Sequence, residues 1–252
     1  GIIIAFSIYS KIPVPQLRWE EEDMRYMLCF FPWVGVIIGL GIYLWNCLCV
    51  WFKAGNLCRS LGMAAIPLII TGGFHVDGFM DTMDAFHSYQ TREKKLEILK
   101  DPHIGAFAVI MLGIYGMIHL AAVSEIENKS YLGVLCCGFF LARCLSGIGV
   151  VCFPSARKEG MLQMFADGSQ RQRVNWCLKA QGTLCTCVMG LMDIWAALVA
   201  FVIALGTFWR YRQRCIKELG GITGDTAGWF VVRCEVWMAV AMAVMDIVQR
   251  GI

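Results

Sequence analysis

Three aspartates are spaced so that they could share one face of a helix. Asp77, Asp81 and Asp84 lie in the string His-Val-Asp-Gly-Phe-Met-Asp-Thr-Met-Asp, which begins at His75. At about 100° per residue they fall within an arc of about 60°, with apolar side chains opposite. Carboxylates this close repel one another, so the spacing predicts a compensating cation, and oxygen ligands favour Mg²⁺, Ca²⁺ or Mn²⁺. Mg²⁺ is the usual ion when a phosphorylated substrate shares the site. The alternative is an acidic helix face that is simply hydrated.

A second polar group follows in the string Lys-Asp-Pro-His-Ile-Gly-Ala-Phe, which begins at Lys100. Asp101 is a candidate ligand for a metal or a hydroxyl group. His103 is a candidate phosphate-binding residue or base. A purely structural alternative also fits, because Asp101 could be a helix N-cap with Pro102 at the first helical position.

A glycine-rich string, Gly-Gly-Ile-Thr-Gly-Asp-Thr, begins at Gly220. Gly221 and Gly224 permit a close backbone approach, Thr223 supplies a hydroxyl group, and amides at the start of a following helix attract anions. With Asp225, these residues are expected to bind a phosphorylated substrate. The alternative for Asp225 is a plain N-cap.

Two basic residues, Arg157 and Lys158, follow the string Phe-Pro-Ser-Ala. The planar guanidinium of Arg157 suits the clamping of phosphate oxygens. Both residues also fit the ordinary positive charge of a loop next to a membrane.

The composition places these groups in a membrane protein. Of the 252 residues, 58% are hydrophobic and 16% are charged, and the mean hydropathy is +0.61. An ordinary soluble domain is about 45–50% apolar and about 25% charged, so these values exclude a disordered chain and a water-soluble enzyme. A net charge of only +3 argues against nucleic acid as a partner. We predict one all-α, polytopic transmembrane domain over residues 1–252, with the lipid bilayer as its surroundings.

Apolar stretches long enough to cross a bilayer predict about seven transmembrane helices. The clear stretches are residues 24–52, 61–74, 104–123, 131–153 and 230–248. The second of them is short and contains Pro67, which predicts a kinked or tilted helix. Residues 183–208 fit one long pass, and residues 174–208 fit two passes that turn near Asp193. Two passes would gather most Lys and Arg residues, and the polar strings, on one face. That face would be the cytoplasmic side of the inner cell membrane.

Two charged residues, Arg143 and Glu235, lie inside apolar stretches, where an unpaired charge is unfavourable. We predict that they pair with each other or line the site. Most of the 13 cysteines also lie in apolar stretches, and there is no Cys-x-x-Cys pair. They are interpreted as small apolar residues.

These strings together resemble the cobalamin synthases, also called adenosylcobinamide-GDP ribazoletransferases. The resemblance covers nearly the whole chain and includes, in order, residues 10–15, 31–35, 75–84, 101–107, 154–160 and 220–228. The family usually has Thr-Arg, Ser, Gly and Glu where this chain has Ser10-Lys11, Pro102, Ala108 and Val232. None of these departures touches the three aspartates.

The resemblance implies a Mg²⁺-dependent transfer late in cobalamin (vitamin B12) biosynthesis. The cobinamide phosphate of adenosylcobinamide-GDP would pass to a ribose hydroxyl of α-ribazole or its phosphate, with release of GMP. In that reaction Asp77, Asp81 and Asp84 would hold Mg²⁺ at the diphosphate. The resemblance leaves open the oligomeric state and any contact with other late cobalamin-assembly enzymes.

The resemblance also implies roles for the other polar residues. Arg157 and the glycine-rich string would cradle phosphate or guanosine. The candidates for the base that accepts the hydroxyl proton are His75, Asp101 and His103, of which His75 is preferred.

Two alternatives belong to other functional classes. CDP-alcohol phosphotransferases also bind a nucleotide diphosphate through aspartates on a helix at the membrane surface, but this chain lacks their Asp-Gly-x-x-Ala-Arg signature. A cation or proton transporter would use the carboxylates as a relay, which predicts acids at mid-depth on successive helices. Here the acids cluster at the ends of the apolar stretches beside basic loops, which favours the transferase.

Overall fold

The computed structural model describes residues 1–15, 26–157 and 168–251, and within these ranges the chain is helical. The helices are α1 (Ile2–Tyr9), α3 (Met27–Trp51), α4 (Asn56–Thr71), α5 (Phe74–His87), α6 (Arg92–Ile98), α7 (Ala106–Glu125), α8 (Lys129–Cys152), α10 (Gly168–Met192), α11 (Ile194–Leu219) and α12 (Gly224–Gly251). The all-α prediction is confirmed for this part of the chain. Its strand-like pairing is limited to an isolated bridge between Ser155 and Ile222.

Four of these helices, α3, α7, α8 and α11, are long and apolar enough to cross a membrane. The shorter helices α4 and α5 meet the same criterion only as a pair, and they are bent by 94° at the break between them. The part of the chain that the structure describes therefore has the character of a helical membrane protein with four or five candidate spans. The seven passes expected from the sequence stay a prediction.

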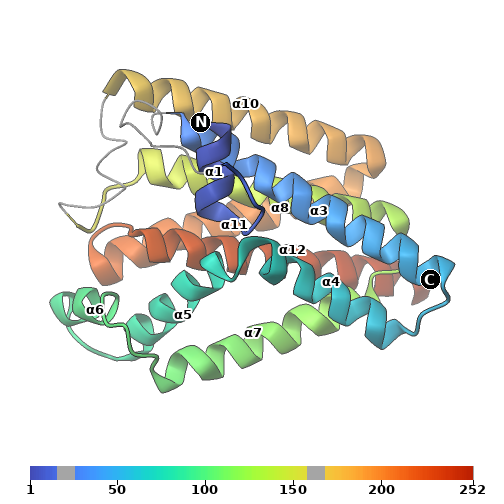
Figure 1. Ribbon diagram of the computed structural model, residues 1–252, viewed down its shortest axis with the longest axis horizontal. Helices are drawn as coiled ribbons and strands as arrows, with labels where there is room; N and C mark the ends of the chain where they lie inside the picture. Colours follow the sequence, from blue (N-terminus) through green and yellow to red (C-terminus); the bar gives the residue numbers. More distant parts are fainter. Residues whose placement is uncertain (16–25, 158–167, 252) are drawn as a thin grey trace.

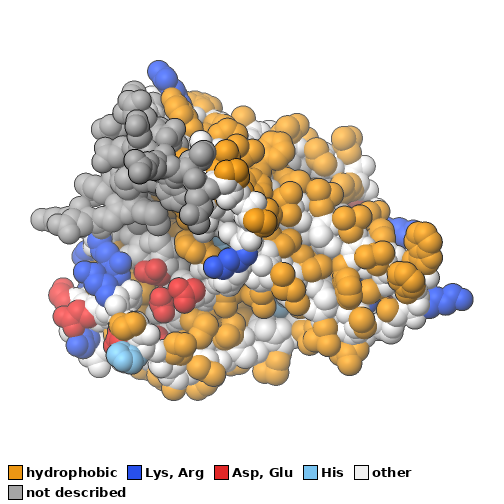
Figure 2. Space-filling view, viewed as in Figure 1, with side chains coloured by type: hydrophobic (Ala, Val, Ile, Leu, Met, Phe, Trp, Pro, Cys, Tyr) orange, Lys and Arg blue, Asp and Glu red, His pale blue; other side chains and the backbone are white. Residues whose placement is uncertain are grey.

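The long helices run side by side in an elongated bundle (Figure 1). The C-terminal ends of α5, α8 and α11 and the first turns of α7, α10 and α12 lie at its left end. We call this the polar end and define it by residues 88–105, 153–157 and 220–223. Figure 2 shows apolar side chains over the middle of the visible face and acidic side chains gathered at the polar end.

The ambiguous stretch around residue 193 forms two helices. Asp193 caps α11, because its side chain accepts a hydrogen bond of 2.8 Å from the backbone N–H of Ala196. Figure 1 shows α10 leaving the polar end and α11 returning to it. The alternative with one long pass is wrong, since it would carry the basic residues after Phe208 to the opposite end.

The bend between α4 and α5 lies at two glycines. Gly72 and Gly73 have φ angles of +62° and +79°, which glycine adopts without the strain that a side chain would add. The helix α4 continues through Pro67 to Thr71, and the kinked or tilted helix expected there stays a prediction. The bend therefore determines the direction in which the aspartate face of α5 points.

The apolar face of α5 packs into the core of the bundle. Phe79, Met83 and Phe86 are buried. The ring of Phe86 meets the ring of Trp229 in α12 edge-on, with 5.3 Å between the ring centroids. This packing confirms the predicted division of α5 into a buried apolar face and a polar face that carries the acids.

All 13 cysteines are free.

Candidate active site

The aspartate face of α5 lies at the polar end. Asp77 is exposed, and Asp81 and Asp84 are half-buried. Asp81 is close enough to Asp77, Asp84 and Asp225 for all three charges to act on its carboxylate. The structure thus brings a fourth acid, from α12, to the three that the sequence analysis places on one helix.

A close backbone contact explains how Asp225 comes to this position. A Cβ atom at Gly78 would lie 2.8 Å from the backbone oxygen of Asp225 and 2.9 Å from its Cα, so only glycine permits this approach of α5 to α12. The sequence analysis assigns Asp225 to the phosphate-binding string alone. The signal that could have revealed the contact is Gly78 itself, a small residue between two acids of one helical face.

Asp84 connects α5 to the start of α7. One of its carboxylate oxygens accepts a hydrogen bond of 2.6 Å from the N–H of Gly105, and the other accepts one of 2.9 Å from the N–H of Ala108. Asp84 therefore binds the free amides at the N-terminus of α7. The N-cap is Gly105, so the alternative that Asp101 caps this helix with Pro102 at its first position is wrong.

Asp101 and His103 form a pair in the loop before α7. Nδ1 of His103 lies 2.6 Å from Oδ1 of Asp101, which also accepts a hydrogen bond of 3.0 Å from the backbone N–H of His103. These hydrogen bonds lower the pKa of the Asp101 carboxyl. Both side chains are exposed, and the ring nitrogen Nε2 of His103 faces away from this pairing. An imidazole oriented by a carboxylate in this way can accept a proton from a bound hydroxyl group.

The glycine-rich loop is bonded to the loop after α8. The N–H of Ala156 donates to the backbone oxygen of Ile222, and the N–H of Ile222 donates to the backbone oxygen of Pro154, both at 2.8 Å. A Cβ atom at Gly221 would lie 2.6 Å from the backbone nitrogen of Ala156. Gly221 thus permits a close backbone approach, as expected for this string. The group that approaches is the backbone of the other loop, whereas the expectation was a phosphorylated substrate.

The first turn of α12 is capped by Thr223. Its N–H donates to Oγ1 of Thr226 at 2.8 Å, and the N–H of Thr226 donates back to Oγ1 of Thr223 at 3.2 Å. The N-cap alternative for Asp225 is therefore wrong, and its carboxylate is left for other contacts. Gly224, at the first position of α12, is exposed and has open space beside its Cα.

Arg157 reaches the Asp225 carboxylate. Its Nη2 lies 3.8 Å from Oδ2 of Asp225 and donates to the backbone oxygen of Leu99 at 3.3 Å. Burial raises the pKa of Asp225 above its usual range, and the nearby Arg157 partly offsets this increase. The predicted phosphate-binding residues Arg157, Thr223 and Asp225 are thus brought together beside the acids of α5. Lys158 lies outside the described residues.

His75 lies on the opposite face of α5 from the aspartates. Its ring is buried and stacks on Phe31 and Tyr9, with centroid separations of 5.5 Å and 6.2 Å. Neither ring nitrogen has a hydrogen-bond partner among the described residues. The structure therefore does not bring this candidate base together with Asp77, Asp81 and Asp225.

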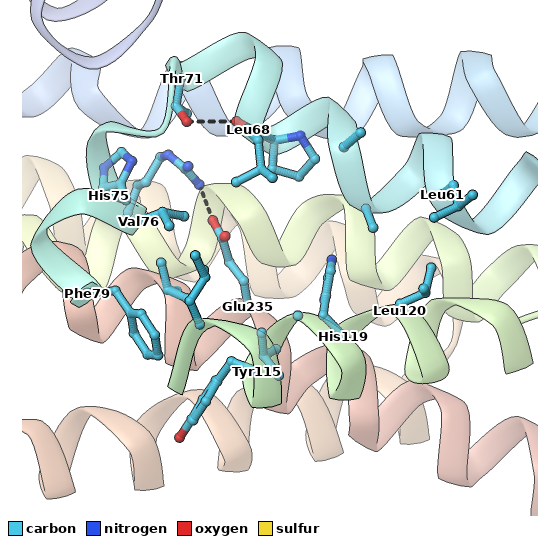
Figure 3. Close-up of a pocket in the computed structure, with 18 residues that line it drawn as sticks. Leu61, Leu68, Thr71, His75, Val76, Phe79, Tyr115, His119, Leu120 and Glu235 are labelled. Carbon is cyan, nitrogen blue, oxygen red and sulfur yellow. Dashed lines mark hydrogen bonds and ion pairs between the residues drawn. The ribbon is translucent and has the colours of Figure 1, made fainter. Parts of the chain in front are cut away.

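A cavity of about 330 Å³ lies beside His75, between α4, α5, α7 and α12. Figure 3 shows His75, His119 and Glu235 around it. The predicted pairing of Arg143 with Glu235 is confirmed here, because Nη1 of Arg143 donates to Oε1 of Glu235 at 2.6 Å. Each charge offsets the cost of burying the other. The pair belongs to this cavity and does not reach the acids of the polar end.

The carboxylates at the polar end fit a hard divalent cation by their chemistry. No three His, Cys, Asp or Glu side chains in the described ranges stand close enough together to form a preassembled metal site. Asp81 nevertheless lies within electrostatic range of three other carboxylates, and the four acids offer a donor set made only of oxygen, with an excess of negative charge.

Comparison with known proteins finds a family model described as cobalamin-5-phosphate synthase, which matches residues 1–243. A protein of Lachnoclostridium phytofermentans named adenosylcobinamide-GDP ribazoletransferase is 39% identical over 243 residues, which are 96% of this chain and 93% of the relative. Proteins of the same name from Desulfitobacterium hafniense and Listeria monocytogenes are 31% and 30% identical, over 89% and 90% of both chains respectively. No solved structure matches this chain.

Proposed function

Because the chain belongs to the cobalamin-5-phosphate synthase family, we propose that it is an adenosylcobinamide-GDP ribazoletransferase. It transfers the cobinamide phosphate of adenosylcobinamide-GDP to α-ribazole or its phosphate, and GMP leaves. The product belongs to the late steps of cobalamin biosynthesis. The match over residues 1–243 carries this assignment, and it includes every polar string that the structure brings to the polar end.

The transfer forms one bond and breaks one. A ribose hydroxyl oxygen bonds to the phosphorus that carries cobinamide, the bridging P–O bond to GMP breaks, and the hydroxyl proton goes to a base. The phosphate charges need partners that hold the diphosphate in line for the attack. Arg157 and the loop at residues 221–225 bring a guanidinium and the open backbone at Gly224 to one place, which supports their role in binding phosphate or guanosine.

Asp77, Asp81 and Asp84 are the proposed Mg²⁺ ligands, and Asp225 is added to them because its carboxylate faces the same space. When bound, Mg²⁺ would neutralise the charge of the diphosphate and of the departing GMP. Asp77 and Asp81 have the greater freedom to serve as ligands. Asp84 keeps unshared oxygen lone pairs beside the two hydrogen bonds that it accepts from α7.

The base is proposed to be His103, oriented by Asp101. The pair is exposed, and it lies just before Gly105, whose N–H donates to Asp84. The preference for His75 loses its basis, because that ring is buried among aromatic side chains on the other face of α5. Asp101 remains ionised through mildly acidic conditions because His103 lowers its pKa, so it can hold the imidazole in one orientation.

The polar end is proposed to face the cytoplasm from the inner membrane. The basic residues of α11, Arg157 and the loop before α7 share this end, which is the distribution that the positive-inside rule associates with the cytoplasmic side. A nucleotide-linked substrate would then meet the acids without crossing the bilayer.

The direct test mixes the purified protein with Mg²⁺, adenosylcobinamide-GDP and α-ribazole and measures the release of GMP. We expect GMP release that requires both substrates and stops when the divalent cation is chelated. Release of CMP from a CDP-alcohol donor, without GMP release, would instead identify a CDP-alcohol phosphotransferase. Full turnover in the presence of chelator would remove Mg²⁺ from the proposal but not the transferase activity.

A further inference from the structure

A groove lined by basic side chains lies along the last turns of α11, where this helix meets α12. Its volume is about 730 Å³. The cations that line it are Arg210, Arg212, Arg214, Lys217 and Arg233. Glu218 is the one acid in its lining, and this carboxylate is already paired with Lys95. The groove therefore has a strong net positive charge that the reaction described above does not use.

The guanidinium groups of Arg214 and Arg233 lie over aromatic rings. The guanidinium carbon of Arg214 lies 4.6 Å from the ring centroid of Phe86, and that of Arg233 lies 4.6 Å from the ring centroid of Trp229. The guanidinium carbon of Arg214 also lies 5.8 Å from the ring centroid of Trp229, so both guanidinium groups pack against the same indole ring. Stacked guanidinium groups keep their N–H edges available and lose little freedom when they bind an anion.

The cations in the groove repel one another. Arg210 and Arg214 are both close enough for their positive charges to act on Arg233. The buried Nε of Arg233 has no hydrogen-bond partner within the described residues. Like charges held together with unused donors are unfavourable without a bound anion, and phosphate is the anion that arginine binds best in this geometry.

An apolar stripe on α11 leads directly to the groove. Leu198, Val202, Leu205 and Trp209 are exposed and lie at helical spacings along one face, and Arg210 follows at once. Exposed apolar side chains that end at a tryptophan are typical of a helix surface that passes from acyl chains to lipid headgroups. The position of the groove at this junction favours a phosphate that is attached to acyl chains over a free one.

We propose that this groove binds the phosphate headgroup of an anionic phospholipid, whose acyl chains lie along the stripe formed by Leu198, Val202, Leu205 and Trp209. The bound lipid would neutralise the cations beside Trp229. Because Phe86 ends the apolar face of α5 and Trp229 lies in the second turn of α12, the lipid would sit behind the two helices that carry the acids.

The test measures lipid retention and does not depend on turnover, so it can fail independently of the proposed transferase activity. The protein is purified in detergent with equal amounts of phosphatidylglycerol and phosphatidylcholine, and the retained lipids are measured by native mass spectrometry. We expect selective retention of phosphatidylglycerol. The double variant Arg214→Gln/Arg233→Gln should weaken this retention by about thirtyfold, since each cation near an anionic surface contributes about fivefold.

Two further variants separate the groove from general effects of charge and folding. Arg210→Gln/Lys217→Gln removes two exposed groove cations that pack on no aromatic ring, and it should weaken retention without changing the helical circular dichroism. Arg173→Gln/Lys179→Gln removes two cations of α10 and should leave retention unchanged. Equal retention by all variants would overturn the proposal. Loss of the selectivity for phosphatidylglycerol together with groove-dependent binding of inorganic phosphate would also overturn it, because the ligand would then be a free anion.

Discussion

Asp84 shows that one carboxylate can serve both chemistry and folding. Helical periodicity correctly places it on the face of Asp77 and Asp81. Nothing in that periodicity indicates that the N–H of Gly105 would lie 2.6 Å from its carboxylate, because the contact depends on how two helices meet. The role of Asp84 at the start of α7 was therefore outside the reach of the sequence. The position of Asp225 was also missed, although Gly78 between two acids of one helical face was a signal for it.

Alanine substitutions should separate the two roles of these acids. Asp84→Ala removes the acceptor for two amides of α7 and should lower the free energy of unfolding by about 1–2 kcal/mol. Asp77→Ala removes an exposed side chain and should change it by less than about 0.5 kcal/mol. Thermal unfolding in detergent measures the difference, and Mn²⁺ binding followed by electron paramagnetic resonance should weaken in both variants. Equal stability of the two variants would contradict the capping role.

Substitutions in the loop before α7 should identify the base. His103→Gln should lower kcat by about 10²–10⁴-fold, the range for loss of a general base. Asp101→Asn should cost about tenfold, because it disturbs only the orientation of the imidazole. GMP release at saturating substrates measures both. If His75→Gln lowers kcat more than His103→Gln while the protein stays folded, the base would be His75.

Metal binding should depend on pH through Asp225. Its pKa is raised by burial and partly lowered by Arg157, and only the ionised carboxylate binds a cation. As the pH falls, Asp225 takes up a proton at a higher pH than an ordinary aspartate does. Arg157→Gln removes the offsetting charge, so Mn²⁺ binding should be lost at a higher pH than in the wild type. A titration at stepwise pH measures this midpoint, with Lys100→Gln as a control for loss of one loop charge. An unchanged midpoint in Arg157→Gln would mean that the charge of Arg157 does not affect the protonation of Asp225.

At the scale of the elements, the helices themselves were largely predictable and their junctions were not. The apolar stretches correspond to α3, α4, α7, α8 and α12, and the turn at Asp193 was one of two stated alternatives. The bend at Gly72 and Gly73 was not predicted, because Pro67 is the commoner kind of residue at a kink. The bridge between residues 155 and 222 leaves no periodic signal, since it pairs two short loops far apart in the chain.

A glycine substitution should show that this bridge supports the site. A Cβ atom at Gly221 would collide with the backbone of Ala156, so Gly221→Ala should separate the two loops and lower kcat/KM for adenosylcobinamide-GDP. Gly113→Ala in α7 is the matched control, because nothing lies within 4 Å of its added Cβ. The control should retain full activity, with stability unchanged or slightly increased by the better helix propensity of alanine. Similar activity in both variants would mean that the bridge is dispensable.

At the scale of the whole molecule, the distribution of Lys and Arg indicates how the bundle is oriented in the membrane. The polar strings were expected on one face from the distribution of Lys and Arg, and the structure brings their described parts to one end of the bundle. The buried pair of Arg143 and Glu235 was also predictable. Charges are rare in apolar stretches, so two of them have few partners other than each other.

Labelling of single cysteines should determine this orientation. In a background without the native cysteines, Glu93→Cys probes the polar end and Ala54→Cys probes the opposite end, and both positions are exposed. A membrane-impermeant maleimide should label Ala54→Cys in intact cells and Glu93→Cys only in inverted membrane vesicles. The reverse pattern would place the acids on the outer side of the membrane and contradict the proposed access of a cytoplasmic nucleotide.

The contact between Gly78 and Asp225 determines when, during synthesis of the chain, the four acids can come together. Asp77, Asp81 and Asp84 leave the ribosome before α7, α8, α10 and α11 are made, whereas the loop bonded to Ala156 and Asp225 follow all four of these helices. A nascent chain that has inserted only its earlier helices has the aspartate helix but lacks Asp225 and the Thr223 cap. The fourth acid thus joins the site only after α11 has been synthesised, so nascent chains that end before Asp225 lack the assembled site.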